Sequence, residues 1–167
     1  MVPAGHEGEV EADAVAGGAT RAESVVAGVK AASGDVVVIH DAARPLVTAE
    51  LIDRVVHRLA DSDAQGVIAA APVADTLKSG RAGVIEGTVD RSALWGAQTP
   101  QAFRADALRT AQESAAEAGE LELATDEAWL IERVGGTVLL EESGGPNLKI
   151  TDRADLAVAE ALLTSRP

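Results

Sequence analysis

The spacing of apolar residues in the first half of the chain predicts two helices and two strands in alternation. Residues 20–23 read Thr-Arg-Ala-Glu, which matches a capping box, and the valines that follow place an apolar side on a helix ending near residue 32. A run of four β-branched residues at 36–39 predicts a fully buried strand. A second amphipathic helix begins after Thr48, and residues 66–71 predict another buried strand. Helix, strand, helix, strand is the order typical of a parallel α/β sheet.

The apolar pattern changes after residue 72 and predicts a hairpin that projects from the domain. Apolar residues at 73–77 and 84–89 flank a turn-rich segment at 79–83. Because an isolated hairpin is unstable in water, we expect an arm at about 73–94 that needs a partner surface. The chain continues with predicted helices at 104–118, 126–134 and 152–163 and predicted strands at 137–140 and 148–150.

The beginning of the chain lacks the opening that a doubly wound fold normally has. Such folds begin with a strand, a glycine-rich loop and a helix. This chain starts with the short apolar stub Met1-Val2 and reaches its first capped helix only at Thr20. We therefore expect one α/β domain over residues 1–167, with its first strand–loop–helix unit missing.

The composition indicates a globular protein outside the membrane. A length of 167 residues with 47% hydrophobic content suits one domain and excludes a disordered chain, and the 2% aromatic share makes the core mostly Ala, Val and Leu. No apolar run reaches the roughly 18 residues of a membrane span, and residues 1–7 lack the basic and apolar regions of a signal peptide. Zero cysteines exclude disulfides, thiolate metal sites and a cysteine nucleophile. We expect a cytoplasmic protein.

The net charge of −13 argues against nucleic acid as the main partner, because phosphate contacts need an excess of Lys and Arg. An acidic enzyme that handles phosphorylated substrates must instead build a local positive pocket. Individual cations among the 14 Lys and Arg residues therefore become candidate site residues.

The strongest candidate for ligand chemistry follows the strand at 36–39, where the sequence reads His40-Asp41-Ala42-Ala43-Arg44-Pro45. In an open α/β sheet, ligands bind at the carboxyl ends of the strands. Asp41 is thus expected where a metal or ribose would lie, and Arg44 where a phosphate would lie. The two small alanines leave room for a ligand to approach the backbone, and the proline forces the chain to turn.

Several other motifs allow two interpretations from the residues alone. Gly17-Gly18 before the first helix is either a simple turn or a place where a ligand approaches the backbone and the helix N-terminus. Thr125-Asp126-Glu127-Ala128 is either plain capping or part of a site. Lys149, between two apolar residues, either lies at an exposed edge or points into a site. The segment Trp95-Gly96-Ala97-Gln98-Thr99-Pro100-Gln101 has the composition of a functional loop.

Taken together, seven motifs in this order resemble a known family. They are Gly17-Gly18-Ala19-Thr20-Arg21-Ala22-Glu23-Ser24-Val25, His40-Asp41-Ala42-Ala43-Arg44-Pro45, Asp75-Thr76-Leu77-Lys78, Thr88-Val89-Asp90-Arg91, Gln98-Thr99-Pro100-Gln101, Thr125-Asp126-Glu127-Ala128 and Asn147-Leu148-Lys149-Ile150-Thr151. The chain, from about Val15 to its end, is similar to the 2-C-methyl-D-erythritol 4-phosphate cytidylyltransferases of the non-mevalonate isoprenoid pathway. The resemblance implies a three-layer α/β/α Rossmann-like nucleotidyltransferase fold, with a mostly parallel sheet. It also implies transfer of CMP from CTP to a sugar-alcohol phosphate, with release of pyrophosphate in the presence of Mg²⁺.

The resemblance assigns the nucleotide and the metal to five residues. Gly18 and Ser24 would contact the cytosine side of CTP, and Ala42 would lie against the ribose with Arg44 nearby. Asp41 would hold Mg²⁺ and would be one of two catalytic residues. A single carboxylate is adequate, since Mg²⁺ prefers one or two carboxylates plus phosphate oxygens to an all-protein cage.

The resemblance assigns the second substrate to five further residues. Thr99, Thr125 and Lys149 would bind the methylerythritol phosphate. Thr76 and Arg91 would come from the arm and reach the substrate phosphate in the neighbouring subunit, which implies a homodimer. Arg91 would be the second catalytic residue, because a guanidinium can hold a phosphate with two donors.

The chain departs from the family pattern in two places. Position 19 is Ala where some members carry an acid, so one nucleotide contact would come from the backbone. No glycine-rich segment followed by Lys precedes Gly17, so we expect the groups that grip the triphosphate to be missing. Two alternatives stay open: a ribitol-5-phosphate cytidylyltransferase, and a non-catalytic remnant that dimerises through its arm.

Overall fold

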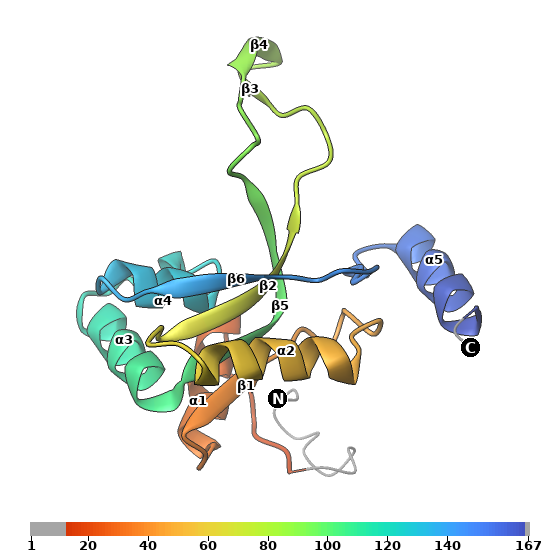
Figure 1. Cartoon of the computed structure of the whole chain (residues 1–167). Helices are drawn as coiled ribbons and strands as arrows, with labels where there is room; N and C mark the ends of the chain where they lie inside the picture. The colour runs from red at the N-terminus through yellow and green to blue at the C-terminus, as the bar shows by residue number, and fades with distance from the viewer. Residues whose placement is uncertain (1–12, 166–167) are drawn as a thin grey trace.

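The computed structural model of the chain describes residues 13–165, which form a sheet flanked by helices, with a thin hairpin reaching out from one end (Figure 1). In chain order the elements are α1 (Arg21–Ala31), β1 (Val36–Ile39), α2 (Ala49–Ala60), β2 (Gly66–Pro72), β3 (Lys78–Arg81), β4 (Val84–Thr88), β5 (Trp95–Arg104), α3 (Ala105–Glu117), η2 (Leu121–Leu123), α4 (Glu127–Arg133), β6 (Val138–Glu142) and α5 (Arg153–Thr164). The predictions for the stub Met1-Val2 and for the lack of a signal peptide fall outside the described residues. Between residues 13 and 165, none of the helices combines the length and apolar character needed to cross a bilayer.

The main sheet has the strand order β1-β5-β2-β6. Strand β5 is antiparallel to both of its neighbours, and β2 and β6 are parallel. Three of the four strands, β1, β2 and β6, therefore run in one direction. The prediction that most strands of the α/β sheet run in the same direction is confirmed. The one reversed strand, β5, makes the sheet mixed.

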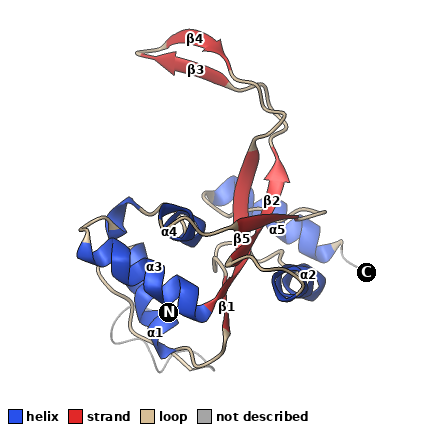
Figure 2. Cartoon of the chain, turned by 60° about the vertical axis from the view of Figure 1, so that its left-hand side comes forward, coloured by secondary structure: helices blue, strands red, loops and turns tan. Residues whose placement is uncertain are grey.

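Helices cover both faces of this sheet, which confirms the three-layer α/β/α prediction. Helices α1, α3 and α4 lie on one side and α2 on the other (Figure 2). The core on the first side includes Val29, Phe103 and Leu108, and the core on the α2 side includes Val55 and Leu59. The capped helix at 21–31 and the amphipathic helix at 49–60 form where the sequence predicted them.

The segment 95–101 is not a loop, so that prediction was wrong. It is the first part of β5, which is inserted between β1 and β2 and reaches Arg104. All five residues from Thr99 to Phe103 are buried, so the strand shows no alternation of polar and apolar positions. The side-chain nitrogen of Gln101 donates to Asp126 and to the carbonyl of Gln98, and the side-chain oxygen of Gln98 accepts from Ser143 and Asn147. These bonds offset part of the cost of placing polar side chains in the sheet.

Strand β1 lies at an edge of the sheet, and the prediction that it is fully buried was also wrong. Val37 is buried, but Val36 and Val38 are 40% and 38% exposed. On one side β1 pairs with β5, and within the described residues no strand lies on its other side. Four β-branched residues in a row therefore indicated a strand correctly but did not indicate its position in the sheet.

The arm projects from the domain as predicted, but its pairing differs in detail. Strands β3 and β4 pair around a tight turn in which Ala82 and Gly83 both have positive φ angles of 49° and 81°. This is the backbone conformation that two-residue hairpin turns require. The predicted first limb at 73–77 lies before the paired strand, which begins at Lys78.

The predicted strand at 148–150 does not form. The Ile150 N–H donates to the carbonyl of Ala43 at 2.8 Å, so this segment is tied to the loop after β1 and not to a sheet strand. The arrangement brings Lys149 to the carboxyl end of β1, where the sequence predicted a ligand.

Candidate functional site

A polar hollow of about 210 Å³ lies where the loop after β1 meets β5. Five of the ten residues predicted for the site line it: Asp41, Arg44, Thr99, Thr125 and Lys149. The other lining residues are Arg21, Ala97, Gln98, Gln101 and Asp126. Five separate segments of the chain thus converge on one concave surface, which is how α/β folds build ligand sites.

Asp41 is the electrostatic centre of the hollow. Its Oδ2 lies 3.1 Å from Nζ of Lys149 and 3.6 Å from Nε of Arg44. Partial burial by itself raises the pKa of Asp41, but the hydrogen bond and charge of Lys149, with the charges of Arg44 and Arg21, outweigh it. The net result is a pKa below the ordinary value, so the carboxylate is ionised at neutral pH.

The loop that carries Asp41 is fixed by contacts to the segment before α5. The Arg44 guanidinium donates to the carbonyl of Asn147 at 2.7 Å, and the Arg44 N–H donates to the carbonyl of Asp41 at 2.9 Å. The Asn147 side chain donates in turn to the carbonyl of Thr99 at 2.8 Å. Arg44 and the loop that carries Asp41 are therefore held in position before any ligand arrives, which favours binding.

Thr99 connects β5 to the same loop. Its Oγ1 accepts from the Asp41 N–H at 3.0 Å and lies 3.0 Å from Nδ1 of His40. Nε2 of His40 lies 3.0 Å from the carbonyl oxygen of Arg44. The sequence placed His40 in the motif that follows β1 but indicated no partner for it, so its contact with Thr99 is information that the fold adds.

Arg21 lines the hollow and forms an ion pair with Glu127, which the sequence alone did not indicate. Nη1 and Nη2 of Arg21 donate to Oε1 and Oε2 of Glu127, each at 2.9 Å. This hydrogen bonding, together with the Glu127 charge, outweighs desolvation and raises the pKa of Arg21, so its charge is permanent. The next residue, Asp126, caps α4 through the Trp129 N–H at 3.0 Å and accepts from the Gln101 amide at 3.2 Å.

Gly18, Ser24 and Ala42, predicted for the nucleotide, do not line the hollow. The Gly18 N–H donates to the Ser24 hydroxyl at 3.0 Å, and that hydroxyl donates to the carbonyl of Thr20 at 2.8 Å. A side chain at position 18 would collide with Glu23. Glycine at this position therefore has a packing reason, besides any contact with a nucleotide.

Thr76 and Arg91, predicted for the substrate phosphate, lie just before β3 and just after β4, and they also do not line the hollow. Both are exposed, and Arg91 donates to the carbonyl of Val73 at 3.1 Å. Within one copy of the chain, the fold therefore does not bring these two residues together with Asp41.

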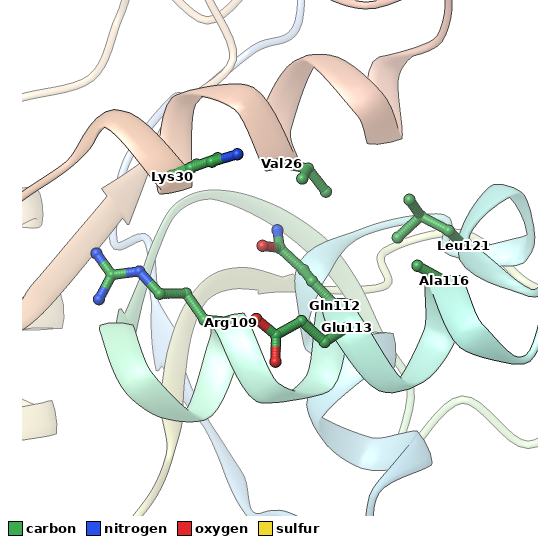
Figure 3. A pocket seen from close by; sticks show the side chains of 7 residues that line it. All are labelled: Val26, Lys30, Arg109, Gln112, Glu113, Ala116 and Leu121. Carbon is green, nitrogen blue, oxygen red and sulfur yellow. The ribbon is translucent and has the colours of Figure 1, made fainter.

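A second hollow, of about 330 Å³, lies between α1 and α3 (Figure 3). It is lined by Val26, Lys30, Arg109, Gln112, Glu113, Ala116 and Leu121. None of the predicted site residues is among them, so this groove is separate from the polar hollow around Asp41.

The chain is similar to known cytidylyltransferases over nearly its whole length. The family model described as "IspD: 2-C-methyl-D-erythritol 4-phosphate cytidylyltransferase" matches residues 5–165. A bifunctional enzyme IspD/IspF of Rhodospirillum rubrum is 50% identical over 153 residues, covering 90% of this chain and 38% of that protein. The 2-C-methyl-D-erythritol 4-phosphate cytidylyltransferase of Bacillus licheniformis is 45% identical over 150 residues, covering 89% of this chain and 63% of that protein.

The fold agrees with the solved structure of a related enzyme. The crystal structure of the 2-C-methyl-D-erythritol 4-phosphate cytidylyltransferase of Thermus thermophilus superposes with a TM-score of 0.81 at 38% identity, covering 90% of this chain and 72% of that one. The chain thus spans less than two thirds of the length of the first two relatives. On the extent of these matches, the chain belongs to the 2-C-methyl-D-erythritol 4-phosphate cytidylyltransferase (IspD) family.

Proposed function

We propose that this protein transfers CMP from CTP to 2-C-methyl-D-erythritol 4-phosphate and releases pyrophosphate. The observation that carries the proposal is the convergence of Asp41, Arg44, Thr99, Thr125 and Lys149 on one hollow, as the family resemblance implied. The names of the relatives support the same reaction. The hollow is proposed as the binding site of the sugar-alcohol phosphate, with the nucleotide approaching from the side of Gly18 and Ser24.

The charges around the hollow suit phosphoryl chemistry. In the proposed reaction a phosphate oxygen of the acceptor attacks the α-phosphorus of CTP, and pyrophosphate leaves on the opposite side. The protein has little covalent work to do and must position the groups and compensate their negative charge. Three cations, Arg21, Arg44 and Lys149, line the hollow beside the carboxylates of Asp41 and Asp126, so donors for phosphate oxygens lie next to a carboxylate that could hold a metal.

The residues around Asp41 fit a bound Mg²⁺. Lys149 and Arg44 both approach Asp41 at Oδ2, and the other carboxylate oxygen, Oδ1, is the one proposed to take the metal. Between residues 13 and 165 no group of three or more His, Cys, Asp or Glu side chains could hold a metal by itself. This suits Mg²⁺, which is commonly held by one or two carboxylates together with substrate phosphates. When bound, the ion would neutralise charge on the nucleotide phosphates, and Asp41 would hold it.

We also propose that the active form is a homodimer in which the arm of one copy reaches the hollow of the other. Thr76 and Arg91 do not line their own hollow, and Val84 and Ile85 expose apolar surface on the arm. The Arg91 guanidinium would hold the substrate phosphate with two donors. The proposed location is the cytoplasm, which rests on the composition alone.

Mixing two defective variants tests the shared site. Arg91→Ala and Asp41→Ala should each lose activity, and mixed dimers of the two should recover part of it, because one of the two hollows then has both residues. A sample that contains only the Arg91→Ala variant, at the same total concentration, is the control and should recover no activity. No recovery from confirmed mixed dimers would contradict the shared site.

Calorimetric titration of 2-C-methyl-D-erythritol 4-phosphate into the purified protein tests the binding role of the hollow. Lys149→Gln should weaken binding by roughly 10- to 100-fold, the value of a hydrogen bond to a charged group. Lys30→Gln is the matched control, because Lys30 lies at the separate groove between α1 and α3 (Figure 3). Equal affinities of the two variants would reject the hollow as the acceptor site, and a preference for ribitol 5-phosphate would favour that alternative substrate.

A further inference from the structure

His40 lies between two oxygen atoms of the proposed site, and the chemistry of these atoms determines where its proton is. Nε2 is 3.0 Å from the carbonyl oxygen of Arg44, which can only accept a hydrogen bond. Nε2 must therefore carry the proton and donate. A neutral imidazole has one N–H, so Nδ1 is an acceptor.

The same argument determines the direction of the next hydrogen bond. Oγ1 of Thr99 lies 3.0 Å from the acceptor Nδ1 of His40, so the Thr99 hydroxyl donates its single proton to the imidazole. One lone pair of Oγ1 accepts from the Asp41 N–H at 3.0 Å. A hydroxyl has one donor and two lone pairs, so the only remaining capacity of Thr99 is one lone pair.

The direction of these hydrogen bonds limits which ligand groups the Thr99 hydroxyl can bind in the hollow. An ionised phosphate offers only acceptor oxygens, and these would face the lone pair of Thr99 without a proton between them. A hydroxyl group of a sugar alcohol offers the donor that Thr99 lacks. Donors for the phosphate are available elsewhere, since Lys149, Arg44 and Arg21 line the same hollow.

We infer that His40 is a positioning residue that fixes the Thr99 hydroxyl as a hydrogen-bond acceptor toward the substrate, so that Thr99 contacts a hydroxyl of the polyol and not its phosphate. The inference rests on the proposed function for the identity of the substrate. It depends on the fold alone for the hydrogen-bond direction, so the two can be tested separately.

Nitrogen NMR of the imidazole tests the direction without any substrate. The protein has three histidines, and the signals lost in His40→Asn identify those of His40. In alkaline buffer, Nε2 should be protonated and Nδ1 should have the shift of an accepting nitrogen. Thr99→Val should shift the Nδ1 signal toward that of a free acceptor, and Thr99→Ser should leave it in place. A proton on Nδ1, or no response to Thr99→Val, would overturn the inference.

Calorimetry with two ligands tests the consequence for binding. Thr99→Val should weaken binding of 2-C-methyl-D-erythritol 4-phosphate by about 5- to 10-fold, the value of one neutral hydrogen bond, and leave binding of inorganic phosphate unchanged. Equal losses for both ligands would show that Thr99 contacts the phosphate and would refute the inference.

Two substitutions of His40 separate its two contacts. Asn places an acceptor where Nδ1 lies and Gln places a donor where Nε2 lies, so His40→Asn should retain the polyol affinity better than His40→Gln. His57→Asn, on the exposed face of α2, is the control for the loss of a histidine. Identical behaviour of the two His40 variants would contradict the positioning role. If the parent protein binds inorganic phosphate but no polyol phosphate, the proposed function fails, and the NMR result still decides the role of His40.

Discussion

Removing either partner of the Arg21–Glu127 ion pair should destabilise the protein by unequal amounts. The Arg21 side chain is 44% exposed, whereas Glu127 is 3% exposed. Arg21→Met leaves a carboxylate in a place that water does not reach, and the cost of an unpaired buried charge is about 3–5 kcal/mol. Glu127→Gln leaves a guanidinium that solvent can reach and keeps one acceptor for it, so we expect a cost of about 1–2 kcal/mol.

Urea unfolding followed by circular dichroism measures both costs as changes in the free energy of unfolding. Arg58→Met is the matched control, because Arg58 pairs with Glu141 at 3.1 Å while its side chain is 49% exposed. That surface pair should contribute about 0–1 kcal/mol. The double variant Arg21→Met with Glu127→Gln should cost less than the sum of the single changes, since no charge is then left buried. If Arg21→Met costs no more than Arg58→Met, the reasoning from burial is refuted.

Two further predictions concern Asp41 and Gly18. Lys149 and the nearby arginines lower the pKa of Asp41 in the folded protein. The ionised carboxylate therefore stabilises the fold fully at pH values above the ordinary carboxyl pKa of about 3.9. This stabilisation is lost as the pH falls through the lower pKa that Asp41 has in the folded state. Lys149→Gln should therefore raise the pKa of Asp41, as followed by carbon NMR of the carboxyl group, and an unchanged pKa would contradict the pairing. Gly18→Ala should lower the free energy of unfolding by about 1–3 kcal/mol, because the new methyl group meets the Glu23 side chain. Gly145→Ala, where an added Cβ meets nothing within 4 Å, should not change the melting temperature.

The sequence predicted best those elements whose pattern is local. The cap at Thr20 and the apolar stripe of α2 depend on residues within a few positions of each other, and both helices formed as expected. Strand β5 was missed because its residues from Thr99 to Phe103 are buried on both faces and so produce no alternation. Strand β1 was placed in the interior because β-branched residues suit an edge strand as well as a central one.

The sequence predicted Asp41, Arg44 and Lys149 as site residues because the charge of each side chain indicates the kind of ligand that it can bind. The pairs that support the site were not predictable, because pairing is a property of the tertiary fold. Arg21 and Glu127 are 106 positions apart, and His40 and Thr99 are 59 positions apart. No local pattern connects such residues, although each belongs to a motif that the sequence had already marked.

Phosphorus NMR of the purified protein incubated with CTP, 2-C-methyl-D-erythritol 4-phosphate and Mg²⁺ tests the central claim most directly. The account predicts the signals of inorganic pyrophosphate together with those of a new diphosphate ester linking cytidine to the polyol. The same sample with Asp41→Ala should give neither. Absence of both products from the unmodified protein, or a product formed equally well by Asp41→Ala, would contradict the claim that CMP transfer takes place at this hollow.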